Sequence, residues 1–130
     1  MRVEEYSRSL EVTDVKELAA ALHSRDERGG ALFCLTPDEN ERYPSLVIRV
    51  TKDYADVHYF PCDGHPGFRC LGGVDLPETG WTRFVYKGCD PEAGEGTPNK
   101  FIIPFDSACA IAEEFLRSSQ RSHAVDWFEL

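Results

Sequence analysis

Residues 45–60 read SLVIRVTKDYADVHYF, and this stretch decides the fold class. Residues 45–50 form a run rich in β-branched side chains, which is typical of a strand. Residues 54–60 form a second strand-like run, and Thr51-Lys52-Asp53 between them makes a short turn. Two such runs joined by a short turn predict an antiparallel hairpin.

Other segments extend this hairpin into a mainly antiparallel sheet. The continuous apolar run 31–35 (ALFCL) is typical of a central strand. Residues 81–86 predict another strand, and residues 101–103 predict a short one that ends at Pro104. The pattern Trp81-Thr82-Arg83-Phe84 is weak evidence for nucleic-acid stacking and favours a part of the sheet core with one exposed arginine. The alternation over residues 125–130 predicts a short last strand with Trp127 on the face that meets the core.

A helix is expected near each end of the chain. Asp14 can cap the first helix, and Glu17 three positions later completes a box-like pair. Gly29-Gly30 closes the segment, with residues 25–28 as an alternative start of the loop. The apolar face of this helix consists of Val15, Leu18, Ala19 and Leu22. Asp106 is the expected cap of the second helix. Its apolar stripe consists of Ala108, Ile111, Ala112, Phe115 and Leu116.

The order of these elements predicts the architecture. Long antiparallel runs with helices at the ends favour an α+β fold, with both helices packed on one side of the sheet. A length of 130 residues corresponds to one domain, so residues 1–130 are expected to form a single unit.

Charge and hydropathy exclude several classes of function. The chain has 14 Lys and Arg against 23 Asp and Glu, a net charge of −9, which disfavours non-specific binding to nucleic acid. A basic protein partner would be attracted, although the acidity could equally serve solubility alone. No apolar run is long enough to span a membrane, and the N-terminus lacks a secretory signal, so we expect a cytoplasmic protein without a membrane partner.

The cysteines do not indicate a metal site, a cofactor or an active site. Their number, five, is odd, and without a secretory context we expect them to be reduced and mostly buried. Cys62, His65, Cys70 and Cys89 form the only metal-like cluster, and it lacks the second close pair that zinc prefers. A cysteine nucleophile paired with a histidine has no local signature here. We therefore predict no catalytic residues and no enzymatic activity, with a thiol- or metal-dependent enzyme as the least favoured alternative.

Two acidic loops are candidate partner-binding sites. Asp75 and Glu78 precede the predicted strand 81–86, while Asp90, Glu92 and Glu95 follow it. Binding residues often lie on loops held by a rigid scaffold. The hypothesis is that at least one loop supplies carboxylates to a basic partner; the alternative is that both are simply solvated.

Several stretches along the chain together match a known pattern. Its pieces are the capped N-terminal helix, residues 44–48 leading into a strand, residues 55–59, a Gly-rich aromatic middle, Ile103-Pro104, the helix 108–116 and the ending 125–130. Trp127 and Glu129 stand at the motif positions of that ending. Over nearly its whole length, the chain resembles immunity protein family one of bacterial polymorphic-toxin systems.

The resemblance implies a function. Such proteins bind the toxic domain of a secreted or contact-delivered toxin in the cytosol and have no catalytic chemistry of their own. Many of these toxins are nucleases or nucleic-acid deaminases, whose substrate sites are basic. The expected role is therefore neutralisation of a cognate toxin by blocking its active site. The alternative is a small acidic protein-interaction or regulatory domain without a toxin partner.

Overall fold

The computed structural model describes residues 1–77, 79–86 and 96–130. In chain order, the elements within them are β1 (Arg2–Glu4), β2 (Ser9–Glu11), α1 (Val15–Leu22), β3 (Gly30–Thr36), β4 (Ser45–Thr51), β5 (Tyr54–Phe60), β6 (Phe68–Cys70), β7 (Trp81–Thr82), β8 (Thr97–Pro98), the 3-10 turn η1 (Asn99–Phe101), β9 (Ile103–Pro104), α2 (Phe105–Ser118) and β10 (Trp127–Glu129).

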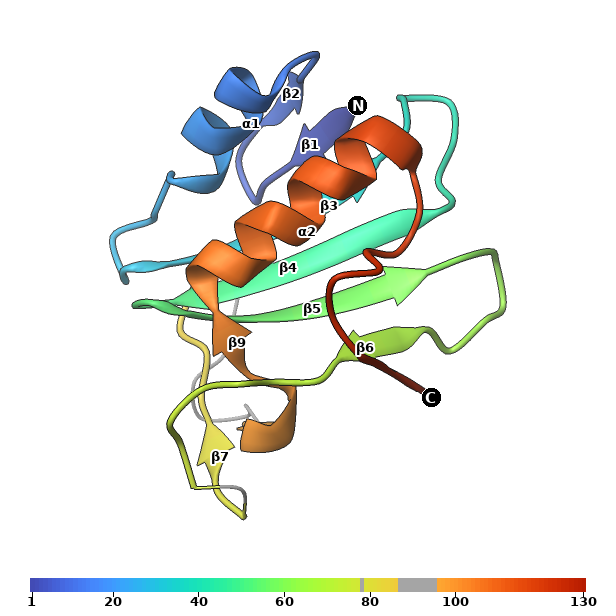
Figure 1. The fold of residues 1–130 in the computed structure, drawn as a ribbon. Coiled ribbons are helices and arrows are strands. Elements are labelled where there is room, and N and C mark those ends of the chain that lie inside the picture. The colour runs from blue at the N-terminus through green and yellow to red at the C-terminus, as the bar shows by residue number, and fades with distance from the viewer. Residues whose placement is uncertain (78, 87–95) are drawn as a thin grey trace.

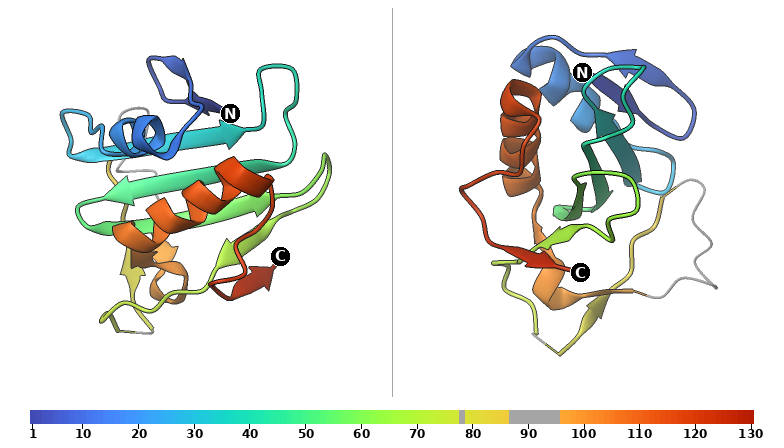
Figure 2. Two further views of the ribbon diagram at one scale, coloured as in Figure 1. Left: turned by 45° about the horizontal axis from the view of Figure 1, so that its top comes forward. Right: turned by 90° about the vertical axis from the view of Figure 1, so that its right-hand side faces the viewer.

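One antiparallel sheet carries the fold. Its strand order is β10-β6-β5-β4-β3-β1-β2, with β9 pairing the start of β5, while β7 and β8 form a separate two-stranded sheet. Both helices cover the same face of the large sheet (Figures 1 and 2). The α+β architecture predicted from the sequence is therefore confirmed, with helices near both ends of the chain.

The β4–β5 hairpin forms with the predicted turn. Thr51 pairs with Tyr54, so Lys52 and Asp53 alone connect the strands, and Lys52 adopts a positive φ of 53°. The buried side chains of β3, β4 and β5 that face the helices alternate along each strand and include Phe33, Ile48 and Val57. This alternation leaves every second side chain on the opposite face, which the helices do not cover.

Helix α1 begins as predicted but buries a shifted face. The Asp14 carboxylate accepts the Glu17 backbone N–H at 2.8 Å. Leu18, Ala21 and Leu22 are buried, whereas Val15 is 40% exposed, because the helix packs through its later residues only. The helix ends at Leu22, well before the predicted stop at the glycine pair, and Gly30 already belongs to β3.

Helix α2 buries the predicted stripe but begins two residues earlier than the predicted cap, Asp106, implies. Ala108, Ile111, Ala112 and Phe115 are buried against the sheet, and Leu116 is partly buried. Asp106 is not the cap, because Pro104 occupies that position without a side-chain hydrogen bond. Asp106 lies in the first turn instead, where its charge complements the helix dipole.

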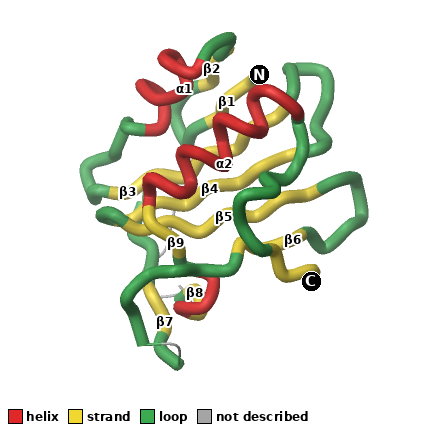
Figure 3. The backbone as a smooth tube through the Cα atoms, viewed as in Figure 1, coloured by secondary structure: helices red, strands yellow, loops and turns green. Residues whose placement is uncertain are grey.

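One element was not predicted, and two further predictions need correction. The chain opens with the short β1–β2 hairpin, for which we had no prediction. Residues 101–103 are not one strand, because Phe101 closes η1 and only Ile103 enters β9 (Figure 3). The strand predicted over residues 81–86 ends at Thr82, and further on the Val85 carbonyl oxygen lies close against Gly30 of β3. In the described part of the chain, no helix is long and apolar enough to cross a bilayer.

The motif residue Trp127 lies on the core side of the last strand. β10 pairs with β6. The ring centroid of Trp127 lies 6.4 Å from that of Tyr59, and the Trp127 indole N–H donates to the Ser122 carbonyl oxygen at 2.9 Å. The neighbouring Phe128 points away from the helices and is 44% exposed. The predicted inward orientation of Trp127 is confirmed, although its side chain is only partly buried.

We predict that Trp127→Ala lowers the free energy of unfolding by about 2 kcal/mol, less than for a fully buried tryptophan, because part of the ring already contacts water. Phe128→Ala on the same strand serves as the control and should cost less than about 1 kcal/mol. Urea denaturation of both variants checks this expectation. Equal losses would mean that the core does not depend on the indole ring.

Candidate partner-binding site

A carboxylate lies buried on the sheet face opposite the helices. Asp56, in the middle of β5, has no exposed surface, and its strand neighbours Ala55 and Val57 belong to the core on the other face. Burying an unpaired carboxylate would be costly, so its partners define this region.

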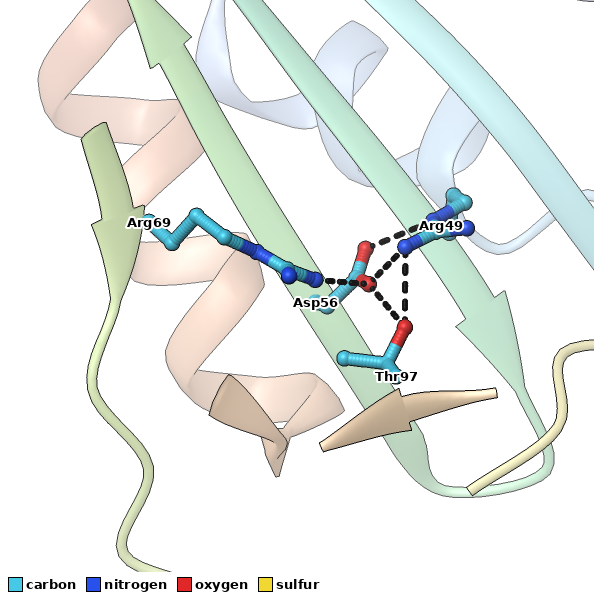
Figure 4. A network of polar contacts seen from close by, with 4 residues as sticks. All are labelled: Arg49, Asp56, Arg69 and Thr97. Carbon is cyan, nitrogen blue, oxygen red and sulfur yellow. Dashed lines mark hydrogen bonds and ion pairs between the residues drawn. The ribbon is translucent and has the colours of Figure 1, made fainter. Parts of the chain in front are cut away.

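Two guanidinium groups and a hydroxyl surround the Asp56 carboxylate (Figure 4). Arg49, directly across the β4–β5 pair, donates from Nε to Oδ1 at 3.0 Å and from Nη2 to Oδ2. Arg69 on β6 donates to Oδ2 at 3.2 Å. The Thr97 hydroxyl donates to Oδ2 at 2.8 Å and accepts from Arg49 at 2.8 Å. We call Arg49, Asp56, Arg69 and Thr97 the Asp56 network.

The Asp56 network affects its two arginines differently. Burial lowers the pKa of Arg49, but two hydrogen bonds and the charge of Asp56 outweigh it, so the pKa of this guanidinium is raised. Burial dominates at Arg69, whose single bond to Asp56 does not compensate, so its pKa is lowered. Both groups stay charged at neutral pH, because arginine titrates far above it. The network therefore carries a net positive charge.

The network fixes a separate unit of the chain, which we call the β7–β8 lobe: residues 71–77, 79–86 and 96–102. Thr97 belongs to the lobe, whereas its bonding partners belong to the main sheet. Two lobe aromatics cover the arginines, with Phe84 5.3 Å from the Arg49 guanidinium and Phe101 4.3 Å from that of Arg69. These cation–π contacts help exclude water from the carboxylate.

Two glycines allow the lobe backbone to approach closely. A Cβ at Gly30 in β3 would lie 1.9 Å from the Val85 carbonyl oxygen. A Cβ at Gly72 would lie 1.9 Å from the carbonyl oxygen of Ile102, and the Gly72 N–H donates to the Lys100 carbonyl at 2.6 Å. Around Val85, where the sequence predicted a continuing strand, the chain instead packs directly on Gly30. A larger residue at position 30 would not leave room for this contact.

Trp81 projects from the anchored lobe. It is 63% exposed, although the sequence pattern around it, Trp-Thr-Arg-Phe, suggested a residue of the sheet core. Asp75, the predicted partner-binding residue in the same lobe, is also exposed. Glu78, Asp90, Glu92 and Glu95 lie outside the described residues. Of the two motif residues, Trp127 packs on the core, and Glu129 is exposed on β10.

The described cysteines differ in exposure, and the expectation that they are mostly buried is wrong. All four are free thiols, but only Cys70 is buried; Cys34 and Cys109 are partly buried, Cys62 is exposed, and Cys89 lies outside the described part. Burial raises the pKa of Cys70 to about 12 and that of Cys109 to about 11. Such thiols stay protonated at neutral pH, which makes them poor nucleophiles. Within residues 1–77, 79–86 and 96–130, no group of three or more His, Cys, Asp or Glu side chains could hold a metal ion.

No model of a protein family matches this sequence, and no curated protein matches it either.

We predict that Asp56→Asn lowers the free energy of unfolding by about 3–5 kcal/mol, because it removes a fully buried carboxylate and leaves two partly buried guanidinium groups without their counter-charge. Asp75→Asn, the same change at an exposed lobe position, should stay within about 0.5 kcal/mol. Urea denaturation at neutral pH measures both. Equal stability of the two variants would show that the network does not hold the lobe.

The second prediction for this region concerns His58, which pairs with Arg69 across β5 and β6. Burial, and then the charge of Arg69, lowers the pKa of His58 to about 4, so folded His58 stays neutral where an unfolded histidine would bind a proton. Its contribution to stability is complete above pH 6.5 and is lost as pH falls from 6.5 to 4. His58→Asn should reduce the loss of stability across this range by about 1–3 kcal/mol.

Urea titrations of the wild type and His58→Asn at pH 7 and pH 4.5 measure this difference. His65→Asn provides a control for removing a histidine elsewhere. Parallel acid losses in the wild type and His58→Asn would contradict the prediction.

Proposed function

We propose that this chain neutralises a toxin protein by binding it stoichiometrically and blocking its active site. The observation that carries the proposal is a rigidly anchored lobe that presents Trp81 and Asp75 to solvent in a chain of net charge −9. A binding function needs such a preorganised surface, since ordering a loop at the moment of association would cost affinity.

The charge favours a particular class of toxin. Nucleases and nucleic-acid deaminases hold phosphates in basic sites, and an acidic protein can occupy such a site. Attraction between opposite charges also speeds association, and salt weakens this effect. The resemblance to immunity proteins of polymorphic-toxin systems supports the same proposal, with the cytosol as the place of encounter.

The alternative from the sequence, an acidic interaction or regulatory domain without a toxin partner, would use the same surface. The neighbouring gene distinguishes the two. If the adjacent reading frame encodes a toxic domain, expression of that domain in a bacterial host should stop growth, and co-expression of this chain should restore it.

We predict that reversing acidic charges near the lobe slows association with that domain. Two variants separate the two acidic loops: Asp75→Lys with Glu78→Lys, and Asp90→Lys with Glu92→Lys and Glu95→Lys. At least one should reduce the association rate about tenfold at low salt and weaken its salt dependence, without changing the melting temperature. Stopped-flow mixing measures the rates. Unchanged kinetics in both variants would place the interface elsewhere, and failure to restore growth with the wild type would overturn the toxin assignment.

A further inference from the structure

The exposure of Trp81 is unfavourable in terms of the hydrophobic effect, because a large apolar ring remains in water. Within the described residues, Trp81 and Tyr6 are the aromatics with more than 60% of their surface exposed. A buried tryptophan removes about 150–250 Å² of surface from water, so an exposed one forgoes the largest apolar gain of any residue type. Single exposed apolar residues are common, and the case for a function therefore depends on how Trp81 is supported.

The support of Trp81 is rigid. Trp81 pairs with Pro98 and Thr82 with Thr97 across the β7–β8 pair. The Thr82 hydroxyl donates to Asn99 Oδ1 at 2.6 Å, and the Asn99 side-chain amide donates to the Pro77 carbonyl at 2.8 Å. The Asn99 backbone N–H donates to the Gly80 carbonyl at 2.9 Å. Thr97, the pairing partner of Thr82, is part of the Asp56 network, so the hydrogen bonds continue from the base of Trp81 into the main sheet.

Two glycines let the chain pack closely around Trp81. A Cβ at Gly96 would lie 3.2 Å from the Trp81 Cβ and 3.0 Å from the Thr82 carbonyl oxygen. A Cβ at Gly80 would lie 2.7 Å from Asn99 Nδ2. Local packing thus fixes the Trp81 backbone while its ring stays in water. A rigid, exposed tryptophan has the properties of an interface hot spot, because it buries a large area at little cost in conformational entropy.

The charge of the whole molecule determines which partner it attracts. Among the described residues of the lobe, Asp75 is acidic and Arg83 and Lys100 are basic, and all three are exposed. The whole chain carries −9, so the attraction for a basic protein comes from the molecule and not from the lobe alone. The lobe contributes one exposed aromatic ring, which an apolar slot on such a protein can bind.

We propose that Trp81 is the anchor of the interface, inserting into an apolar slot beside the basic substrate site of the toxin. This inference rests on the proposed function, because it names the contact through which the toxin is held. The Asp56 network and the close backbone contacts at Gly30 and Gly72 lie away from this interface. They support it indirectly, because they hold the lobe in one position on the sheet.

The test compares two aromatic residues of equal exposure. Tyr6, in the turn between β1 and β2, is 66% exposed and lies at the other end of the molecule from β7 (Figure 1). Calorimetric titration of the toxin domain with Trp81→Ala should show at least about 30-fold weaker binding than the wild type, whereas Tyr6→Ala should stay within about threefold. Trp81→Phe should recover part of the loss. The melting temperature of Trp81→Ala should change by less than about 2 °C, because the ring is mostly in water.

Each result decides a different claim. If the wild type binds the toxin domain and the Trp81→Ala and Tyr6→Ala variants bind it with equal affinity, Trp81 is not the anchor, but toxin neutralisation still stands. Absence of binding by the wild type overturns the proposed function and the anchor with it. Weakened binding by a Trp81→Ala protein with a lowered melting temperature also counts against the anchor, because the lobe would then have been disturbed.

Discussion

The buried carboxylate of Asp56 is the constraint on which the sheet face opposite the helices depends. An ionised group in an apolar sheet persists only when its hydrogen-bonding capacity is filled and water is kept away. Arg49 and Arg69 supply the charge from the flanking strands, and Thr97 supplies a hydroxyl from the lobe. The helices need no such arrangement, since their contacts with the sheet are apolar. Apolar packing thus stabilises the face under the helices, whereas hydrogen bonds and ion pairs stabilise the region around Asp56 on the opposite face.

This division bears on the assignment of function to the two faces. The helical face forms the core, where side chains are chosen for volume and shape. The opposite face carries the lobe, which is held by the directional bonds of the Asp56 network together with the buried aromatics Phe84 and Phe101. A binding surface attached in this way keeps its geometry through contacts separate from the core beneath the helices. The thiols and Trp127, which the sequence also brings to attention, belong to the structural side of this division.

Local sequence pattern was sufficient for the hairpin, for both helices and for the fold class. It also contained the Arg49–Asp56 pair, because the two residues lie symmetrically about the Lys52-Asp53 turn. It could not reveal the rest of the network, since Arg69 and Thr97 reach Asp56 across 13 and 41 residues of chain. Trp81 was misassigned to the core for a similar reason: alternation describes a strand, but only tertiary packing decides whether a second sheet covers it.

The spacing of the network also implies an order of assembly. Arg49 and Asp56 are seven residues apart and come together as soon as the two-residue turn closes, whereas Thr97 must return over a long stretch of chain. A ribosome releases the hairpin well before it releases residue 97. The short separation lets the carboxylate meet a guanidinium while both are still in water, before the residues that cover them are synthesised. On that route, no isolated ion of this sheet has to lose its water.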